Sequence, residues 1–442
     1  MHGNAELLEF QERHESNART YPRNLPLAIR RASGSHVLDM EGKSYIDFLS
    51  GAGVLALGHG HPQVLDAIVE QLPLLTHGLD IPTPVKAEFT RRHLEMLPEG
   101  MRDRMRMHFC GPTGADAVEA AVKLCKTATG RSEVIAYQGG YHGCTAGAMA
   151  LTSLVAPKRR IGNLMPGVHF MPYSYCAQCP LKLSSDTCDV NCVAMLESSL
   201  EDSHAGFTTP AAVIVELVQG EGGSVPAHPE FVRRLREATR AAGVPLIVDE
   251  IQTGAGRTGT WFAFEQYGIE PDVILLSKAV GGGLPVSLMI YDEALDVWEP
   301  GSHIGTFRGN QLAFAAGLAV MDVFEKEDVL ANVRERSAQA FAALAPLAEE
   351  LPSVLDVRGK GLMIGVELAG THEVSAADLA REIQQACFDA GLLIERGGRD
   401  DRVLRLLPPL NIAEETFARG LYILATAIRE TTDRRLTAAS RT

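Results

Sequence analysis

The sequence predicts an α/β fold in which a mostly parallel sheet is covered by helices on both faces. Between about residues 80 and 325, short apolar runs alternate with amphipathic segments of helical periodicity. The apolar runs are continuous, as expected of parallel strands that are buried on both faces. Chains that alternate strands with helices form doubly wound sheets with right-handed crossovers. The candidate strands are residues 133–137, 212–217, 245–249 and 272–276.

Local patterns predict further elements along the chain. Residues 36–43 are typical of a β-hairpin, with Gly42 near its turn. Apolar residues at helical spacing after Gly114 predict a helix that stops near Gly130. Residues 229–242, rich in Arg and Ala, predict a second amphipathic helix.

The two ends of the chain together predict a second domain. Beyond about residue 330 the pattern changes to long helices rich in Ala, Leu and Glu, with a short strand at 363–368 between them. We therefore expect a small domain built from residues 1–75 and 326–442, and a large domain formed by residues 76–325. The polar residues 431–442 are expected to fray.

Composition and charge narrow the class of protein. Of the 442 residues, 46% are hydrophobic and 22% are charged, which is ordinary for a globular protein. The formal net charge of −14 disfavours nucleic acid as a partner, because a phosphate backbone would be repelled. No apolar run approaches the ~20 residues that span a bilayer, and the first residues lack the pattern of a secretory signal. We therefore expect a cytoplasmic protein that binds neither nucleic acid nor membrane.

Two polar residues stand where neighbouring predicted strands end. Asp249 ends the strand at 245–249, while Lys278 follows the strand at 272–276 and precedes the glycine run 281–283. In open α/β sheets, ligands bind at the carboxyl ends of the strands. A partly desolvated lysine there has a lowered pKa and a nucleophilic amine, and glycines let the backbone pass close to a flat ligand. Taken singly, Asp249 fits a helix cap and Lys278 a surface lysine, but their combination with the glycine run favours a ligand site.

A glycine-rich turn, residues 111–116, opens the helix that follows Gly114. Backbone N–H groups at a helix N-terminus suit a phosphate dianion. By itself such a turn is a weak indication of a phosphate site. Together with Asp249 and Lys278, however, it resembles the class III aminotransferases (the ω-aminotransferase group). The resemblance extends along nearly the whole chain.

This resemblance implies a fold and a cofactor. Members have fold type I of the pyridoxal-phosphate enzymes, with a mostly parallel seven-stranded sheet in the large domain and a small α+β domain built from both chain ends. The implied cofactor is pyridoxal 5'-phosphate. Residues 112–116 depart from the Ser-Gly-Thr/Ser-Glu-Ala of most relatives and are similar to the variant of diaminobutyrate aminotransferases.

The resemblance also assigns roles to single residues. Lys278 would bind the cofactor covalently and move the proton during catalysis, and Asp249 would pair with the protonated pyridine nitrogen. Tyr141 and Ile251 would cover the two faces of the ring, although Tyr141 taken alone fits an ordinary buried tyrosine equally well. Gln252 would bond the phenolic oxygen. The remaining cofactor-binding residues that the resemblance implies are Thr113, with its hydroxyl donor, Gly114, Ala115, His142 and Glu216.

Three further residues concern the partner subunit and the substrate. The loop 305–310 resembles one that carries Thr306 to the phosphate of the neighbouring subunit, which implies a homodimer with shared active sites. Residues 216–223 resemble a Glu-Pro-Val-Gln-Gly-Glu-Gly-Gly signature with leucine in place of proline. In relatives the acid matching Glu221 pairs with the arginine matching Arg405. The resemblance implies that Arg405 binds a carboxylate of 2-oxoglutarate bidentately and that Glu221 neutralises it when an ω-amine is bound; a permanent ion pair is the alternative.

Four of the eight cysteines cluster with the spacing x2, x8 and x3, namely Cys176, Cys179, Cys188 and Cys192. Four thiolates at such spacing can hold zinc or an iron–sulfur centre, and in a cytoplasmic chain they favour metal over disulfides. Reduced, unliganded thiols are the alternative. His59 and His61 are expected to be structural. The other cysteines are expected to be small buried apolar residues: Cys110, Cys125, Cys144 and Cys387.

The function that the resemblance implies is transamination between an ω-amine and 2-oxoglutarate or glutamate. Residues 15–21, 111–116 and 305–310 are similar to diaminobutyrate–2-oxoglutarate transaminases, so 2,4-diaminobutyrate is the expected donor. One alternative keeps the cofactor but changes the reaction to racemisation, elimination or carbon–carbon bond formation. Another is a non-catalytic regulator, although the segment before Ser35 is too short and too weakly basic for a DNA-binding helix-turn-helix.

Overall fold

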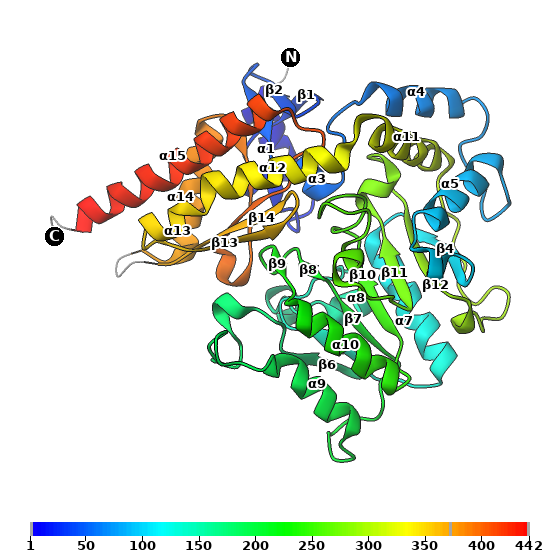
Figure 1. Ribbon diagram of the computed structural model, residues 1–442. Coiled ribbons are helices and arrows are strands. Elements are labelled where there is room, and N and C mark those ends of the chain that lie inside the picture. Colours follow the sequence, from blue (N-terminus) through cyan, green and yellow to red (C-terminus); the bar gives the residue numbers. More distant parts are fainter. Residues whose placement is uncertain (1–2, 371–373, 440–442) are drawn as a thin grey trace. The chain divides into compact units, whose positions relative to one another are not determined.

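The computed structural model describes residues 3–370 and 374–439, with side chains to residue 435 (Figure 1). The chain forms two compact units. The first comprises Met1–Pro62 and Val329–Thr442, and the second comprises Gln63–Asp328. Residues 63–75 and 326–328, which we expected in the small domain, thus fall within the second unit.

A seven-stranded sheet forms the centre of the second unit. Its strand order is β4–β12–β11–β10–β7–β5–β6. β12 runs antiparallel to both of its neighbours, whereas β11, β10, β7, β5 and β6 pair in parallel. The prediction of a mostly parallel seven-stranded sheet is therefore confirmed. The strands are β4 (Met105–Gly111), β5 (Val134–Tyr137), β6 (Val168–Met171), β7 (Ala212–Val215), β10 (Leu246–Asp249), β11 (Val273–Leu276) and β12 (Ser287–Asp292).

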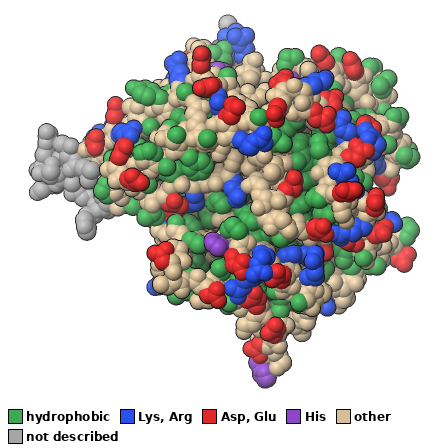
Figure 2. Space-filling view, viewed as in Figure 1, with side chains coloured by type: hydrophobic (Ala, Val, Ile, Leu, Met, Phe, Trp, Pro, Cys, Tyr) green, Lys and Arg blue, Asp and Glu red, His purple; other side chains and the backbone are tan. Residues whose placement is uncertain are grey.

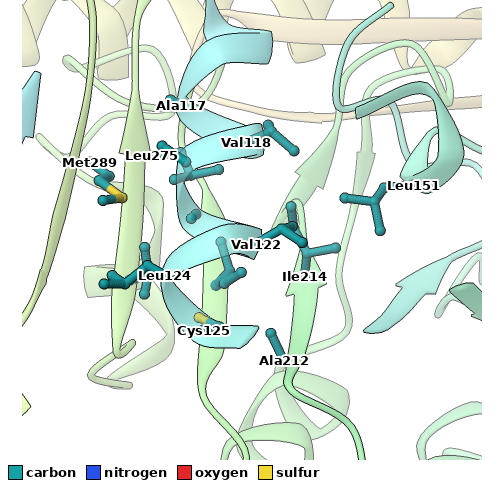
Figure 3. Packing of buried hydrophobic residues seen from close by; sticks show 14 of the residues in the cluster. Ala117, Val118, Val122, Leu124, Cys125, Leu151, Ala212, Ile214, Leu275 and Met289 are labelled. Carbon is teal, nitrogen blue, oxygen red and sulfur yellow. The ribbon is translucent and has the colours of Figure 1, made fainter. Parts of the chain in front are cut away.

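The helix α7 (Gly114–Thr129) shows why helices cover this sheet. Figure 3 shows its side chains Val118, Val122 and Leu124 packed among buried residues of the strands, Ile214 and Leu275 among them. Burial of one Val or Leu side chain stabilises the fold by about 1.5–3 kcal/mol. The helix stops where predicted, because Gly130 adopts the left-handed conformation with φ of 68°.

The other elements of this unit surround the sheet or extend its loops. A two-stranded ribbon, β8 (Val218–Gln219) and β9 (Val225–Pro226), follows β7. The helices are α4 (Pro62–Gln71), α5 (Pro84–Glu95), α6 (Glu99–Arg102), α8 (Ala146–Leu151), α9 (Asn191–Glu201), α10 (Pro229–Ala241) and α11 (Gln311–Glu327).

The first unit is an α+β structure that draws on both ends of the chain. One of its sheets has the order β1–β2–β3–β15, in which β3 from the N-terminal part pairs in parallel with β15 from the C-terminal part. The second has the order β13–β14–β17–β16. The strands are β1 (Ile29–Ser33), β2 (His36–Asp39), β3 (Ser44–Asp47), β13 (Val354–Lys360), β14 (Met363–Leu368), β15 (Leu392–Leu393), β16 (Glu395–Gly397) and β17 (Val403–Leu406).

Helices pack on these two sheets. Figure 1 shows α12, α14 and α15 beside β13 and β14. The helices are α1 (Asn4–His14), α2 (Tyr21–Asn24), α3 (Ser50–Gly53), α12 (Val329–Leu344), α13 (Pro346–Glu350), α14 (Ala376–Asp389) and α15 (Glu414–Ala439).

Local predictions in this unit had mixed outcomes. The hairpin at 36–43 is confirmed by β2 and β3, with Gly42 at a φ of 87° in its turn. The expectation that residues 431–442 fray was wrong for 431–439, because α15 continues to Ala439, while residues 440–442 lie outside the described part of the chain. Thr431 and Thr432 are buried, and the Thr432 hydroxyl lies 2.9 Å from that of Ser353. Tertiary packing therefore overrides the polar composition there.

The described surface carries mixed charge. Figure 2 shows acidic and basic side chains interspersed over the face in view. Within the described part of the chain, no helix has both the length and the apolar character needed to cross a membrane.

Candidate active site

The predicted site residues gather around one cavity of the second unit. The cavity has a volume of about 500 Å³ and lies where β5, β7, β10 and β11 end and α7 begins. Parallel strands end at the same edge of a sheet, and ligands of open α/β sheets bind at that edge. The predicted residues that line the cavity are Thr113, Gly114, Ala115, Tyr141, His142, Glu216, Glu221, Asp249, Ile251, Gln252 and Lys278.

Asp249 is the last residue of β10, and its carboxylate is buried. Its Oδ2 lies 2.8 Å from Nδ1 of His142, and its Oδ1 accepts a hydrogen bond from the backbone N–H of Ile251 at 3.0 Å. Burial by itself would lower the pKa of His142, but the hydrogen bond to Asp249 and the charge of that carboxylate outweigh it, so the pKa is raised. The hydrogen bond with His142 therefore fixes the position of the Asp249 carboxylate. Sequence reasoning placed His142 in the site but did not find this partner.

Glu216 fixes the two loops that follow β5 and β7. Its Oε2 accepts from the backbone N–H of Tyr141 at 2.8 Å, and its Oε1 accepts from that of Gly220 at 3.0 Å. Burial raises the pKa of Glu216 to about 7. The loop after β5 is held a second time, because the N–H of His142 donates to Thr152 Oγ1 at 2.9 Å. The positions of His142 and Tyr141 are therefore fixed by side chains of other elements.

Lys278 lies two residues after the end of β11 and has a φ of 50°, in the left-handed region. This conformation costs a non-glycine residue roughly 1–2 kcal/mol, and such strain gathers at functional sites. The neighbouring Ser277 is tied down, because its hydroxyl donates to the carbonyl of Val286 at 2.8 Å. The surrounding structure therefore determines the direction in which Lys278 leaves the strand.

The glycine run after Lys278 serves packing rather than the approach of a ligand. A Cβ on Gly281 would lie 2.8 Å from the side chain of Val286, and one on Gly282 would lie 2.8 Å from Ala316. Gly282 also has a φ of 59°. Our expectation that these glycines let the backbone pass a flat ligand is corrected: they let it pass the protein's own side chains and α11.

The N-terminus of α7 offers backbone donors at the cavity. Thr113 precedes the helix, and both its N–H and its hydroxyl donate to Oδ2 of Asp116 at 2.9 Å. The Thr113 hydroxyl, expected as a phosphate donor, is thus engaged within the turn in this structure. Gly114 and Ala115 remain the residues at which α7 meets the cavity, so the N–H groups of the first helical turn are the donors available for an anion.

Tyr141 and Ile251 line the cavity as an aromatic and an aliphatic surface. A Cβ at Gly114 would lie 2.8 Å from Cδ1 of Ile251, so glycine is required where α7 passes this side chain. The Tyr141 hydroxyl lies 3.2 Å from Sγ of Cys144. Burial raises the pKa of Tyr141, which therefore stays a neutral phenol. Cys144 also lines the cavity and is exposed, so the expectation that it is a buried apolar residue was wrong; Cys110, Cys125 and Cys387 are buried.

Two predicted site residues lie elsewhere. Thr306 belongs to the second unit but has an exposed side chain outside this cavity, and its carbonyl accepts from Nε2 of His77 at 2.9 Å. Arg405 belongs to the first unit, on β17, and is buried there. It forms an ion pair with Glu395, with Nη1 and Oε2 3.1 Å apart. The predicted pairing of Arg405 with Glu221 stays a prediction.

The four clustered cysteines line one small cavity of about 70 Å³. Cys176 begins a short 3-10 turn, and Cys192 lies in the first turn of α9. The N–H of Asn191 lies 3.4 Å from Sγ of Cys188. Among residues 3–370 and 374–439, however, no set of three or more Cys, His, Asp or Glu is arranged to hold a metal ion. A metal here stays a prediction. His59, expected to be structural, bonds Asp47 Oδ2 through Nε2 at 2.8 Å.

The cavity in the second unit fits pyridoxal phosphate in its size and its chemistry. Its volume lies within the 300–1,000 Å³ typical of cofactor sites. The buried carboxylate of Asp249 suits a protonated ring nitrogen, and the amine of Lys278 suits an aldehyde. Tyr141 and Ile251 suit a flat ring, and the first turn of α7 suits a phosphate.

Comparison with known proteins agrees with this fit. The family model described as aminotransferase class-III matches residues 18–428. A diaminobutyrate–2-oxoglutarate aminotransferase of Rhizobium meliloti (strain 1021) is 47% identical over 434 residues, which is 96% of this chain and 92% of that protein. A second diaminobutyrate–2-oxoglutarate aminotransferase, from Haemophilus influenzae, is 45% identical, and the match covers 92% of this chain and 92% of that protein.

Solved structures give the same picture. The ornithine aminotransferase of Toxoplasma gondii, with partial occupancy of pyridoxal phosphate at its active site, matches with a TM-score of 0.85 and 27% identity, over 98% of this chain and 95% of that one. An amine transaminase from an uncultivated Pseudomonas species, solved with pyridoxal phosphate bound, matches with a TM-score of 0.83 and 27% identity, over 95% and 98%.

Proposed function

The chain belongs to the class-III aminotransferases, and from that premise we propose that it transfers an amino group from 2,4-diaminobutyrate to 2-oxoglutarate. The predictions of family, fold class and pyridoxal phosphate as cofactor are confirmed by the family match and by the solved relatives. The proposed substrates rest on one observation: relatives that are 47% and 45% identical over nearly the whole chain carry this activity in their names.

The residues around the cavity can each be given a task. Bound pyridoxal phosphate supplies an aldehyde that captures amines and a cationic ring that draws electrons from them. Lys278 would hold the cofactor through Nζ, and the same amine, once released, would accept the proton that leaves the donor and return it later. The carboxylate of Asp249 would face the ring nitrogen and favour its protonated form, and His142 holds that carboxylate in place.

The remaining residues bind and orient. The N–H groups at the start of α7 hold the phosphate, with Gly114 and Ala115 at the contact. Tyr141 and Ile251 restrict the tilt of the ring and keep water from its faces. Gln252 holds the phenolic oxygen. Glu216 orders the Tyr141 loop through the backbone contact described above.

The substrate residues act by charge. Arg405 binds a carboxylate of 2-oxoglutarate. Glu221, which lines the cavity, neutralises the charge of Arg405 when the amine donor is bound. Without an anion beside it, the guanidinium of Arg405 would repel a cationic amine and favour the binding of a dicarboxylate. The exchange therefore lets one enzyme accept two substrates of different charge in turn.

We also propose that two copies of the chain form a homodimer and that Thr306 serves the partner's phosphate. Thr306 lies in a loop with the exposed apolar side chains of Ile304 and Phe307. This loop contacts the segment around His77, whose ring meets Phe307 edge-on with centroids 5.4 Å apart. The adjoining apolar residues that are also exposed are Leu72, Leu74, Leu75, Leu79 and Ile81. A surface of this kind is typical of a subunit contact. The cytoplasmic location stays a prediction from composition.

A donor panel tests the proposed activity. The purified holoenzyme is given 2-oxoglutarate with 2,4-diaminobutyrate, ornithine, 4-aminobutyrate, lysine or alanine, and glutamate is measured. We expect the highest kcat/KM with 2,4-diaminobutyrate. Glutamate formation from another amine with none from 2,4-diaminobutyrate would refute the proposed donor. Racemisation or elimination of the donor without glutamate would refute transamination.

A further inference from the structure

We infer that Glu395 is a built-in counter-ion of Arg405 and that it determines how strongly Arg405 attracts a substrate carboxylate. The inference deepens the proposed function and rests on it. It concerns residues of the first unit alone: the strands β16 and β17 and the short helix α2.

Strand pairing places the two charges together. β16 and β17 are antiparallel neighbours, and Glu395 lies directly opposite Arg405 in their register. Residues directly opposite in an antiparallel pair point to the same face of the sheet. Their charged atoms, Oε2 of Glu395 and Nη1 of Arg405, are 3.1 Å apart. The backbone ladder therefore sets this ion pair, and it does not depend on a mobile loop.

Burial strengthens the interaction between the charges of Arg405 and Glu395. The side chain of Arg405 is fully buried, and that of Glu395 is 12% exposed. At the protein surface such a pair is screened by water and contributes little. In a buried setting, close charges interact strongly, and a guanidinium next to a carboxylate presents less positive charge to other anions.

A third residue holds Glu395 in position. The hydroxyl of Tyr21, in α2, donates to Oε1 of Glu395 at 3.1 Å. The same helix contacts the next residue of β16, because Nη2 of Arg396 donates to Oδ1 of Asn24 at 3.0 Å. Glu395 is thus held on one oxygen by Tyr21 while the other faces Arg405.

Several other charges near these strands belong to ion pairs of their own. Arg396 pairs with Asp401, and Arg358 and Arg402 both pair with Glu367. Glu395 is therefore the acid that the β16–β17 register assigns to Arg405. Its expected effect is to weaken the binding of dicarboxylates at Arg405, so that the site also accepts an amine donor.

The test measures carboxylate binding without turnover. Glutarate, a dicarboxylate that cannot be transaminated, is titrated calorimetrically into the holoenzyme of the wild type and of Glu395→Gln. We expect Glu395→Gln to bind glutarate roughly tenfold more tightly, a typical size for the loss of a close competing charge. In the separate half-reactions, KM for 2-oxoglutarate should fall, and kcat/KM for the amine donor should fall as well.

Two further variants complete the design. Tyr21→Phe removes only the hydroxyl that holds Glu395 and should shift glutarate binding in the same direction by a smaller factor, so it tests the inference even where Glu395→Gln folds poorly. Glu350→Gln removes an acid that pairs with Arg429 on the surface of the same unit and should leave glutarate binding unchanged.

Several results would overturn the inference. One is equal glutarate affinity in wild type, Glu395→Gln and Tyr21→Phe. Another is an equal loss in both half-reactions together with a lowered Tm, which is the signature of a merely structural ion pair. The proposed function fails in a different way: the wild type would form no glutamate from any amine and 2-oxoglutarate, while the glutarate titrations would still report on Glu395.

Discussion

Replacing His142 by phenylalanine tests the electrostatic centre of the site. The substitution keeps a flat ring in a fully buried position but removes the donor 2.8 Å from Asp249. A hydrogen bond to a charged group contributes about 1.5–3 kcal/mol. Asp249 would keep the N–H of Ile251 as a partner, so we expect the apoprotein to lose about 2 kcal/mol of unfolding free energy at pH 6, within the same range.

The effect of His142 has a definite pH dependence. The pKa of His142 is raised in the folded protein, where burial opposes and the hydrogen bond to Asp249 favours the proton. Its stabilising contribution is therefore fully present below the unfolded pKa of about 6.5 and is lost as the pH rises through the folded pKa. The difference in unfolding free energy between wild type and His142→Phe should be largest near pH 6 and should shrink toward alkaline pH.

Urea denaturation of both apoproteins between pH 5.5 and 9.5 measures this difference. A second readout is the dissociation constant of pyridoxal phosphate, which should rise in His142→Phe because Asp249 is no longer held in position. A stability difference that is independent of pH, or that grows as the pH rises, would refute the reasoning. Glu133→Gln is a suitable control, because Glu133 pairs with a partly exposed histidine, His169, away from the cavity.

The remaining predictions concern the amine, a buried acid and the thiols. Lys278→Ala should abolish the absorbance of the covalently bound cofactor and reduce turnover by several orders of magnitude; reduction with borohydride followed by mass spectrometry checks the attachment site. In the wild type, the free energy of unfolding should fall as the pH rises from about 4.5 toward 7, since burial raises the pKa of Glu216 to about 7. Glu216→Gln should remove this fall, and identical stability profiles of the two proteins would argue against this. Elemental analysis of the purified protein should find near-stoichiometric zinc or iron if the cysteine cluster binds metal, with loss of that metal in Cys188→Ser; metal-free protein with unchanged activity would dispose of that site.

Sequence periodicity is sufficient to predict the strands that carry the chemistry. β10 and β11 are continuous apolar runs, so the amino-acid pattern alone places Asp249 and Lys278 at one sheet edge. The resemblance to a family then supplies the positions on the other strands and on α7. Boundaries are less predictable, because the end of α15 depends on Thr431 and Thr432 finding partners far away in the chain.

The contacts that tune the charges are out of reach of sequence reasoning. His142 and Asp249 are separated by 107 positions, and their bond depends on the loop after β5 meeting the end of β10 in space. The role of the glycine run was also misjudged, because the side chains that Gly281 and Gly282 must pass, Val286 and Ala316, are chosen by tertiary packing. Residue types at strand ends thus reveal which chemistry is present, whereas their partners follow only from the fold.

The same distinction applies to substrate choice, where our two proposals give one arginine, Arg405, two acidic partners. In the proposed function Glu221 neutralises Arg405, as the matching acid does in relatives, and Glu221 lies in the loop that follows β8. Glu395 lies opposite Arg405 in the strand register, and this position leaves Glu395 little freedom to move. A mobile acid can withdraw and let Arg405 bind a dicarboxylate at full strength, whereas a fixed acid weakens that binding at all times. If both act, the fixed acid lowers the free energy that the mobile one must overcome, and the enzyme alternates between its two substrates with a smaller rearrangement than Glu221 alone would require.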